Sequence, residues 1–204
     1  MNKKIIDIIE LSEKHEAWTS NWHTHLVCGE STPLLAAIEE NHRHNFELWH
    51  EEDIARRDDL PAARIKDAKR KIDKCNQARN NAMERMDDWF LNALAADSVR
   101  CEDGVLHSET PGMMIDRLSI MALKAYHMRE QVERSDVSAE HRAKCAARVQ
   151  VLVEQQLDLR KALETLVKEL FAGRRRFKIY RQFKMYNDPE LNPQLYRTTV
   201  AQKT

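Results

Sequence analysis

The chain is poor in glycine and proline, with only four glycines and five prolines among its 204 residues. Together they make up roughly 4% of the chain, against about 12% in an average protein. This scarcity excludes collagen-like, Pro/Gly-rich disordered and turn-dense β-sandwich architectures. The few glycines and prolines are separated by long uninterrupted segments, and each segment predicts a helix.

The chain also lacks a net charge and long apolar runs. Its 33 basic and 33 acidic residues cancel, which argues against nucleic acid or an acidic membrane as a partner. No stretch approaches the roughly 20 apolar residues of a membrane span. Near the N-terminus, Asp7 and Glu10 interrupt the isoleucines, so we expect no signal peptide and a cytoplasmic protein.

Closely spaced cysteines are absent as well. The four cysteines are Cys28, Cys75, Cys101 and Cys145, and no two of them are closer than 26 residues. This spacing excludes CxxC metal or redox motifs and a compact disulfide framework. We expect reduced thiols.

The glycines and prolines divide the chain into five expected helices and a tail. Thr32 and Thr110 each precede a proline, as an N-cap precedes proline at the first helical position, and Gly173 fits a helix stop. Short connections between long helices predict an all-α fold, an antiparallel bundle of about five long helices in one domain spanning residues 1–204. The expected helices cover residues 3–27, 33–57, 61–96, 111–134 and 138–172.

The C-terminal segment differs in composition from the helical core of residues 3–172. Residues 174–204 carry eight Lys and Arg but only two Asp and Glu, mixed with aromatic residues. We therefore expect a basic, aromatic loop extension over residues 173–204. Such a mixture suits phosphate or single-stranded nucleic acid, and the neutral net charge argues against nucleic acid. The alternative is a basic segment that covers one end of the bundle.

The apolar face of the second expected helix turns polar along its length. Unpaired buried polar groups cost about 1–3 kcal/mol each, so we interpret the polar part as a buried or cleft-lining cluster. The alternative, a helix end that projects into solvent, is disfavoured by the tryptophan within the stripe. By helical periodicity the stripe contains His42, Asn45, Trp49, Glu52, Asp53 and Arg56.

The third expected helix carries a candidate partner stripe. Asn and Asp are poor choices inside a helix unless their side chains are occupied, so this stripe either faces the cleft or is ordinary surface. Its members are Asp73, Asn76, Asn80, Glu84 and Asp87.

The fourth expected helix is apolar nearly all round, which predicts burial on several sides. It nevertheless carries Asp116, Arg117, Ser119, Lys124 and His127. Asp116 and His127 share one face, so we expect them to point into the same space. A structural salt-bridge network, for example between Asp116 and Arg79, is the alternative.

A divalent metal site is a weaker alternative. Oxygen and imidazole ligands would come from His42, Asn45, Glu52 and Asp53, joined by Asp73, Glu84 and Asp87. The Glu47-x-x-His50 pair lies off the polar stripe, and the pairs His23-x-His25 and His42-x-His44 point about 200° apart on a helix, so none is interpreted as a chelating pair. The sequence assigns no metal ligands and leaves the cofactor open.

Three segments carry a resemblance to a known family. They are HRHNFELWHEED at 42–53, TPGMMIDRLSI at 110–120 and YRQFKMYNDP at 180–189. Together they resemble the bacterial domain-of-unknown-function family numbered 4254, over nearly the whole chain. The resemblance carries no assigned reaction. It implies an association with glycosyltransferases of envelope polysaccharide synthesis, because genes of this family often accompany theirs.

The leading functional hypothesis is a polar central cleft that binds a small phosphorylated or sugar-linked ligand, with catalysis left open. His42 and His127 are the candidates for proton transfer, because histidine titrates near neutral pH. The other hypothesis is a non-catalytic accessory or scaffold protein that binds a partner such as a glycosyltransferase. The oligomeric state is not readable from the sequence. The expected ligand-binding residues are His42, Asn45, Trp49, Glu52, Asp53, Arg56, Asp73, Asn76, Asn80, Asp116, Arg117, Lys124, His127, Arg181, Lys184, Asn187 and Asp188.

Overall fold

The computed structural model describes residues 6–181 and 189–194, and its architecture is all-α, as the sequence predicts. Two very short strands add a minor element. The elements are α1 (Ile8–Trp22), α2 (Pro33–Ala55), α3 (Ala62–Ala96), β1 (Val105–Leu106), α4 (Pro111–Glu133), α5 (Ala139–Phe171) and β2 (Arg175–Arg176).

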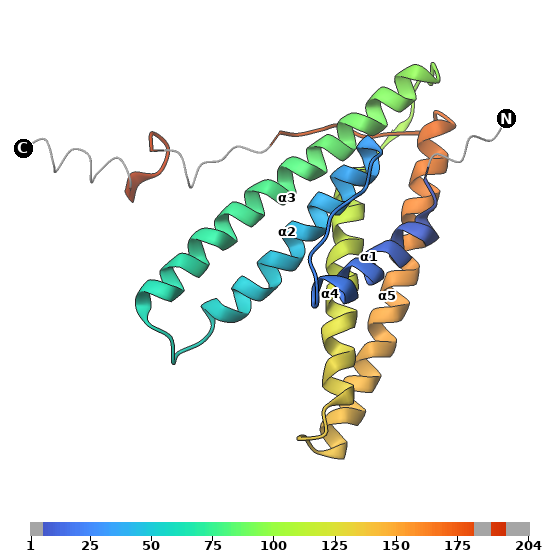
Figure 1. The fold of residues 1–204 in the computed structure, drawn as a ribbon. Coiled ribbons are helices and arrows are strands. Elements are labelled where there is room, and N and C mark those ends of the chain that lie inside the picture. Colours follow the sequence, from blue (N-terminus) through green and yellow to red (C-terminus); the bar gives the residue numbers. More distant parts are fainter. Residues whose placement is uncertain (1–5, 182–188, 195–204) are drawn as a thin grey trace, which may run out of the picture.

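The long helices form two antiparallel hairpins, α2 with α3 and α4 with α5, which diverge from a shared end of the molecule (Figure 1). The first helix, α1, packs across α4 and also contacts α5 and α2. The main core lies where the hairpins meet, around the fully buried Ile38, Phe90, Ile115 and Leu163. Toward the far ends of the hairpins the helices have fewer neighbours, so parts of α5 such as Val151 remain exposed.

The helix starts follow the capping residues in the sequence. The Thr32 and Thr110 side chains accept hydrogen bonds from the backbone N–H groups of Leu35 and Met113, at 3.4 and 3.2 Å. Each is followed by proline in the first helical turn. Gly173, just after α5, adopts a φ of +70°, the left-handed conformation that ends a helix. The two threonine caps and the glycine stop are thus confirmed.

The first helix is shorter than the expected 3–27. It begins after Asp7, whose carboxylate accepts from the N–H groups of Ile9 and Glu10, and it ends at Trp22. In the segment that follows α1, the backbone N–H groups of Gly29 and Glu30 donate to the buried Glu39 carboxylate on α2, at 3.0–3.1 Å. These bonds hold the connecting segment outside a helix, and helical periodicity gives no sign of them.

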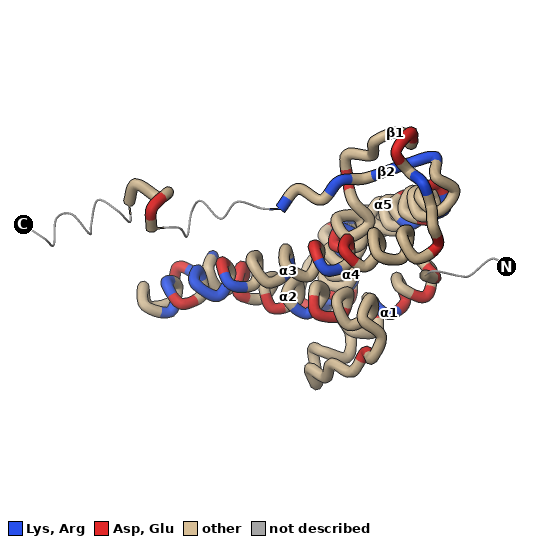
Figure 2. Tube along the Cα trace, turned by 90° about the horizontal axis from the view of Figure 1, so that it is seen from above, with Lys and Arg blue, Asp and Glu red and all other residues tan. Residues whose placement is uncertain are grey.

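The start of the C-terminal extension packs on the bundle. β2 pairs in parallel with β1, with Val105 opposite Arg175. Phe177, directly after β2, is buried in the main core. Figure 2 shows the blue Lys and Arg positions gathered at β2, and mixed charges along α2 and α3. None of the helices in the described part of the chain combines the length and the apolar character that a membrane span requires.

Candidate functional site

The polar residues of α2 enter a buried network at the crossing of α1, α2 and α4. The Asn45 amide donates to Ser119 Oγ at 2.9 Å, and Ser119 Oγ lies 2.8 Å from His42 Nδ1. On the other side of the ring, His42 Nε2 lies 3.0 Å from Thr19 Oγ1, which donates to the His15 carbonyl. Because a hydroxyl has one hydrogen and a carbonyl only accepts, we assign Nε2 of His42 as the protonated nitrogen. Ser119 then donates to Nδ1, so that each hydrogen bond in this series has one donor and one acceptor.

The carboxylate of this network is Asp116. Its Oδ1 accepts from the Asn41 and Asn45 amides, both at 2.9 Å. Arg79 donates to Asn45 Oδ1 at 2.9 Å, and its guanidinium lies 3.9 Å from Asp116 Oδ2. This ion pair of Asp116 with Arg79 is the one that the alternative of a structural salt-bridge network predicts.

Burial closes most of this network to solvent, and Arg79 at its edge is half-buried. His42 is fully buried and Asn45 and Asp116 are nearly so, and burial, followed by the neighbouring His15, keeps the pKa of His42 well below its usual value. The ring is therefore neutral near pH 7, with both nitrogens bonded inside the protein. A group in this state stabilises the crossing of three helices and has no proton to offer to a ligand.

His15 beside this network predicts a pH-dependent stability. Burial lowers its imidazole pKa from the usual 6.5 to about 3, and its ring stacks on His42 with centroids 4.8 Å apart. Below about pH 6.5 the His15 imidazole binds a proton in the unfolded protein, whereas it stays neutral in the folded protein. Stability is therefore lost as the pH falls, by roughly 1 kcal/mol between pH 7.5 and 5.5.

The test is to compare urea unfolding of the wild type and His15→Phe at both pH values. Phenylalanine keeps an aromatic ring and removes two ring nitrogens that have no hydrogen-bond partner among the described residues. The difference in the free energy of unfolding, variant minus wild type, should be larger at pH 5.5 than at pH 7.5 by roughly 1 kcal/mol. Asp87, whose pKa burial raises to about 6, contributes in the opposite sense, and the comparison cancels it. A gap between wild type and variant that is constant with pH would contradict the assignment.

A second cluster, the histidine triad of His23, His50 and His127, lies where the end of α1 meets α2 and α4. One ring nitrogen from each lies within 4.8 Å of the other two. Flat stacking fixes two of the rings: Tyr126 lies on His23 with centroids 4.4 Å apart, and Trp49 lies on His127 at 4.8 Å. The triad is half-buried, in contrast to the closed network around His42.

The hydrogen bonds of His23 and His127 show which nitrogen of each ring carries a hydrogen. His23 Nδ1 lies 2.7 Å from the Thr19 carbonyl, and His127 Nδ1 lies 2.7 Å from a Glu130 carboxylate oxygen. Since these oxygens only accept, both Nδ1 atoms carry the hydrogen. In the neutral form of each ring Nε2 then keeps a lone pair, and both Nε2 atoms are buried without a hydrogen-bond partner in the described part of the chain.

The third triad ring, His50, has a lowered pKa. Burial is the main cause, and the nearby His23 and His127 rings add to it, while Asp53 and Glu130 oppose it. The imidazole is therefore neutral at pH 7. A neutral ring can supply a lone pair to a ligand or a metal.

The structure divides the other expected ligand residues among separate places. Glu52 and Arg56 pair with each other at 2.7 Å near the end of α2, with Asp53 exposed between them. Asp73 is exposed and lies 3.6 Å from Lys69, and Asn76 and Asn80 are half-buried on α3.

The expected residues on α4 and in the C-terminal extension lie apart from these. Arg117 pairs with Glu109, and Lys124 is exposed. Arg181 pairs with Glu84 and Asp88. Lys184, Asn187 and Asp188 lie outside the described residues.

The expectation that Asp116 and His127 point into the same space is wrong. The two share a face of α4, but 11 residues of helix separate them by roughly 16 Å. Asp116 therefore contacts α2 and α3 inside the network, whereas His127 lies in the triad.

Sequence reasoning missed Asn41, and it set His23 and His50 aside because neither belongs to a local chelating pair. Asn41 lies beside the polar stripe of α2, one residue before His42, and an Asn at a helix midpoint was the available signal. His23 and His50 give no local signal, because each meets its partners only through the packing of α1, α2 and α4.

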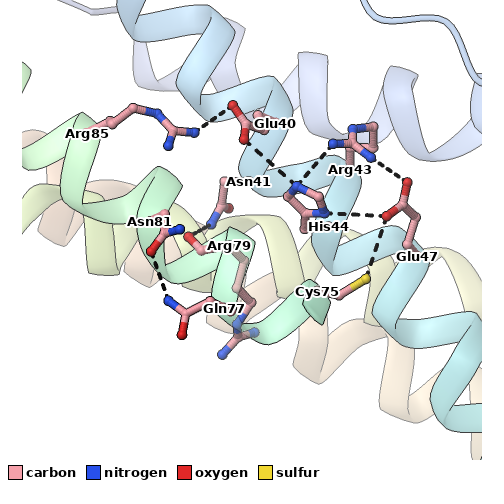
Figure 3. A network of polar contacts seen from close by, with 10 residues as sticks. All are labelled: Glu40, Asn41, Arg43, His44, Glu47, Cys75, Gln77, Arg79, Asn81 and Arg85. Carbon is pink, nitrogen blue, oxygen red and sulfur yellow. Dashed lines mark hydrogen bonds and ion pairs between the residues drawn. The ribbon is translucent and has the colours of Figure 1, made fainter. Parts of the chain in front are cut away.

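Another group with metal-binding side chains, His44, Glu47 and Cys75, lies between α2 and α3 (Figure 3). Most of its atoms already have partners, although His44 Nδ1, which lies 3.4 Å from a Glu47 carboxylate oxygen, makes no hydrogen bond with the described residues. Arg43 donates to Glu47 at 2.6 Å and contacts His44 Nε2 at 3.0 Å, and the Cys75 thiol lies 3.6 Å from the same carboxylate. Burial and Glu47 raise the pKa of Cys75 to about 11, so this sulfur is a thiol and a poor ligand.

The family comparison matches residues 35–179, most of the chain, to the protein family of unknown function DUF4254. The chain belongs to the DUF4254 family. No curated protein and no solved structure matches it significantly. The DUF4254 match runs from the first turn of α2 to just beyond β2, and it includes His42, Asn45, Asp116, His50 and His127. The first helix, with His15 and Thr19, and His23 directly after it precede the matched residues.

Proposed function

We propose that this DUF4254 protein binds a small phosphorylated or sugar-linked ligand of bacterial envelope glycan metabolism, in the cytoplasm, at the histidine triad. One observation carries the proposal: the buried Nε2 atoms of His23 and His127 have no hydrogen-bond partner among the described residues. Buried polar atoms without partners are rare and costly in native proteins. A sugar hydroxyl that donates to these nitrogens, or an ion that binds them and the ligand together, would remove the cost.

The surroundings of the triad support this choice of ligand class. Ligand sites combine aromatic walls with a few convergent polar groups, and Trp49 and Tyr126 border the triad. The exposed Lys124 lies one turn of α4 before His127, at a position where an ammonium group can attract phosphate. Asp53 on α2 and Glu130 on α4 supply carboxylates near His50, of the kind that accept hydrogen bonds from sugar hydroxyls.

The test is a thermal-shift and calorimetric screen against sugar phosphates, nucleotide-sugars and nucleotides. A ligand at 100 times its Kd stabilises a protein by about 2.7 kcal/mol, enough to raise the Tm by several degrees. The shift should be lost in His50→Ala and retained in Asp73→Ala, since Asp73 lies exposed on α3. A panel without a binder, or a shift retained in His50→Ala, would contradict the proposal.

The second candidate is a non-catalytic accessory protein that binds a glycosyltransferase. It is favoured by the hydrogen bonds that both ring nitrogens of His42 make inside the protein, and by a groove of about 360 Å³ between α1, α2 and α3, lined by Ile6, Leu35 and Trp89. Trp89→Ala should then abolish co-purification with the glycosyltransferase, while the exposed Leu91→Ala should not. Equal co-purification of both variants would exclude this groove as the contact.

A further inference from the structure

We propose that His23, His50 and His127 bind a single divalent transition-metal ion of the zinc class and leave one coordination position open. The inference deepens the proposed function, on which it rests for the role of these three rings. Three imidazoles from facing helices are a ligand set of catalytic zinc sites, in which the fourth position holds water or substrate. A phosphate or hydroxyl oxygen of the proposed ligand would take that position.

The distances suit an ion of this size. The three ring nitrogens lie within 4.8 Å of one another. A tetrahedral ion with bonds of about 2.0–2.1 Å sets its ligands roughly 3.4 Å apart. To bind such an ion, the ring nitrogens would have to approach one another by no more than about 1.4 Å.

The partners of the Nδ1 atoms prepare two of the rings for metal. A metal-binding histidine commonly donates its other N–H to a carboxylate or a backbone carbonyl, which fixes the tautomer and strengthens the ligand. His127 has this bond to Glu130, and His23 has it to the Thr19 carbonyl, both at 2.7 Å. The nitrogen that would bind metal is in both rings the buried Nε2 without a partner among the described residues.

The donor type selects the metal. Imidazole nitrogen suits Zn²⁺, Cu²⁺, Ni²⁺ and Co²⁺, whereas Mg²⁺ and Ca²⁺ require oxygen ligands. The group of His44, Glu47 and Cys75 is a weaker candidate, because Arg43 occupies both its carboxylate and its imidazole Nε2 (Figure 3).

The first experiment titrates the chelator-treated full-length chain with Co²⁺ and then Zn²⁺, with no organic ligand present. We expect one equivalent of Co²⁺ to give the visible absorption of a tetrahedral site and Zn²⁺ to displace it. His50→Ala and His127→Ala should each weaken binding more than 100-fold, and His25→Ala should bind as the wild type does, because His25 lies exposed outside the triad. Circular dichroism identifies any variant that has not folded.

A second pair of variants keeps the test decisive if a histidine variant fails to fold. Glu130→Gln replaces the exposed carboxylate that holds His127 and should weaken metal binding about 10–100-fold. Glu133→Gln, exposed near the end of the same helix, should have no effect.

The proposal would be overturned by a chain that binds no metal, by unchanged binding in both His50→Ala and Glu130→Gln, or by loss of binding in Cys75→Ser. Because the titration contains no sugar or phosphate, its result is independent of the ligand screen. Metal binding without a ligand hit would retain the metal site and reject the proposed function, and a ligand hit without metal binding would do the reverse.

Discussion

Asp116→Ala should lower the free energy of unfolding by about 3–5 kcal/mol, the range seen when one partner of a buried ion pair is removed. The carboxylate accepts from the amides of Asn41 and Asn45 and lies beside Arg79. Without it, two buried amide donors lose an acceptor and the half-buried guanidinium loses its counter-charge. The effect should appear as a shift in the midpoint of urea unfolding with an unchanged m-value.

Two variants distinguish this effect from the general cost of removing a helical aspartate. Asp73→Ala removes an exposed carboxylate that lies 3.6 Å from Lys69, and should change stability by less than about 1 kcal/mol. Asp116→Asn keeps an oxygen that can accept from both amides, so its cost should fall between the two. Equal, small effects of Asp116→Ala and Asp73→Ala would show that the network does not stabilise the helix crossing.

Gly112→Ala should destabilise the protein by about 3 kcal/mol, an effect of overpacking. A Cβ at this position would lie 2.6 Å from the Met83 carbonyl oxygen and 2.7 Å from a carboxylate oxygen of Asp87. The Gly112 N–H donates to that same oxygen at 2.7 Å, so α4 begins directly against α3. An added methyl group would push the two helices apart and weaken this bond.

Gly29→Ala is the matched control for this change. Gly29 has no described atom within 4 Å of an added Cβ, and its variant should lie within about 0.5 kcal/mol of the wild type. Thermal and urea unfolding of the two variants give the comparison. Equal stabilities of both variants would contradict the close approach of α3 and α4.

The sequence predicts the five helices and three of their ends because these features depend on neighbouring residues. A threonine followed by proline specifies a helix start at Thr32 and Thr110, and glycine specifies the stop at Gly173. The segment after α1 is held instead by Glu39, which accepts from backbone N–H groups about ten residues before it. A bond between separate segments leaves no periodic signal.

The division of the polar stripe of α2 is a second limit of sequence reasoning. Helical periodicity places His42, Asn45, Trp49 and Asp53 on one face, but it carries no information on how far the facing helices extend. The hairpins diverge (Figure 1), so His42 and Asn45 are buried, Trp49 is half-buried and Asp53 is exposed. One stripe therefore contributes to a closed network and to the half-buried triad.

The triad itself could not be predicted from spacing. His23 directly follows α1, His50 lies on α2 and His127 lies on α4, whereas local metal motifs require ligands a few residues apart on one element. Their convergence depends on the packing of α1 across α4 and on the contact of α2 with α4.

The central claim is that the triad, and not the buried network, is the site that binds an exogenous group. A proton–nitrogen correlation spectrum of the imidazole rings tests it most directly, because it reports the state of each ring nitrogen. Before metal is added, His23 and His127 should show a hydrogen on Nδ1, and His42 should appear as a neutral ring with the hydrogen on Nε2. One equivalent of Zn²⁺ should shift the triad nitrogens and leave His42 unchanged. Unshifted triad resonances, or shifts confined to exposed rings such as His25, would contradict the account.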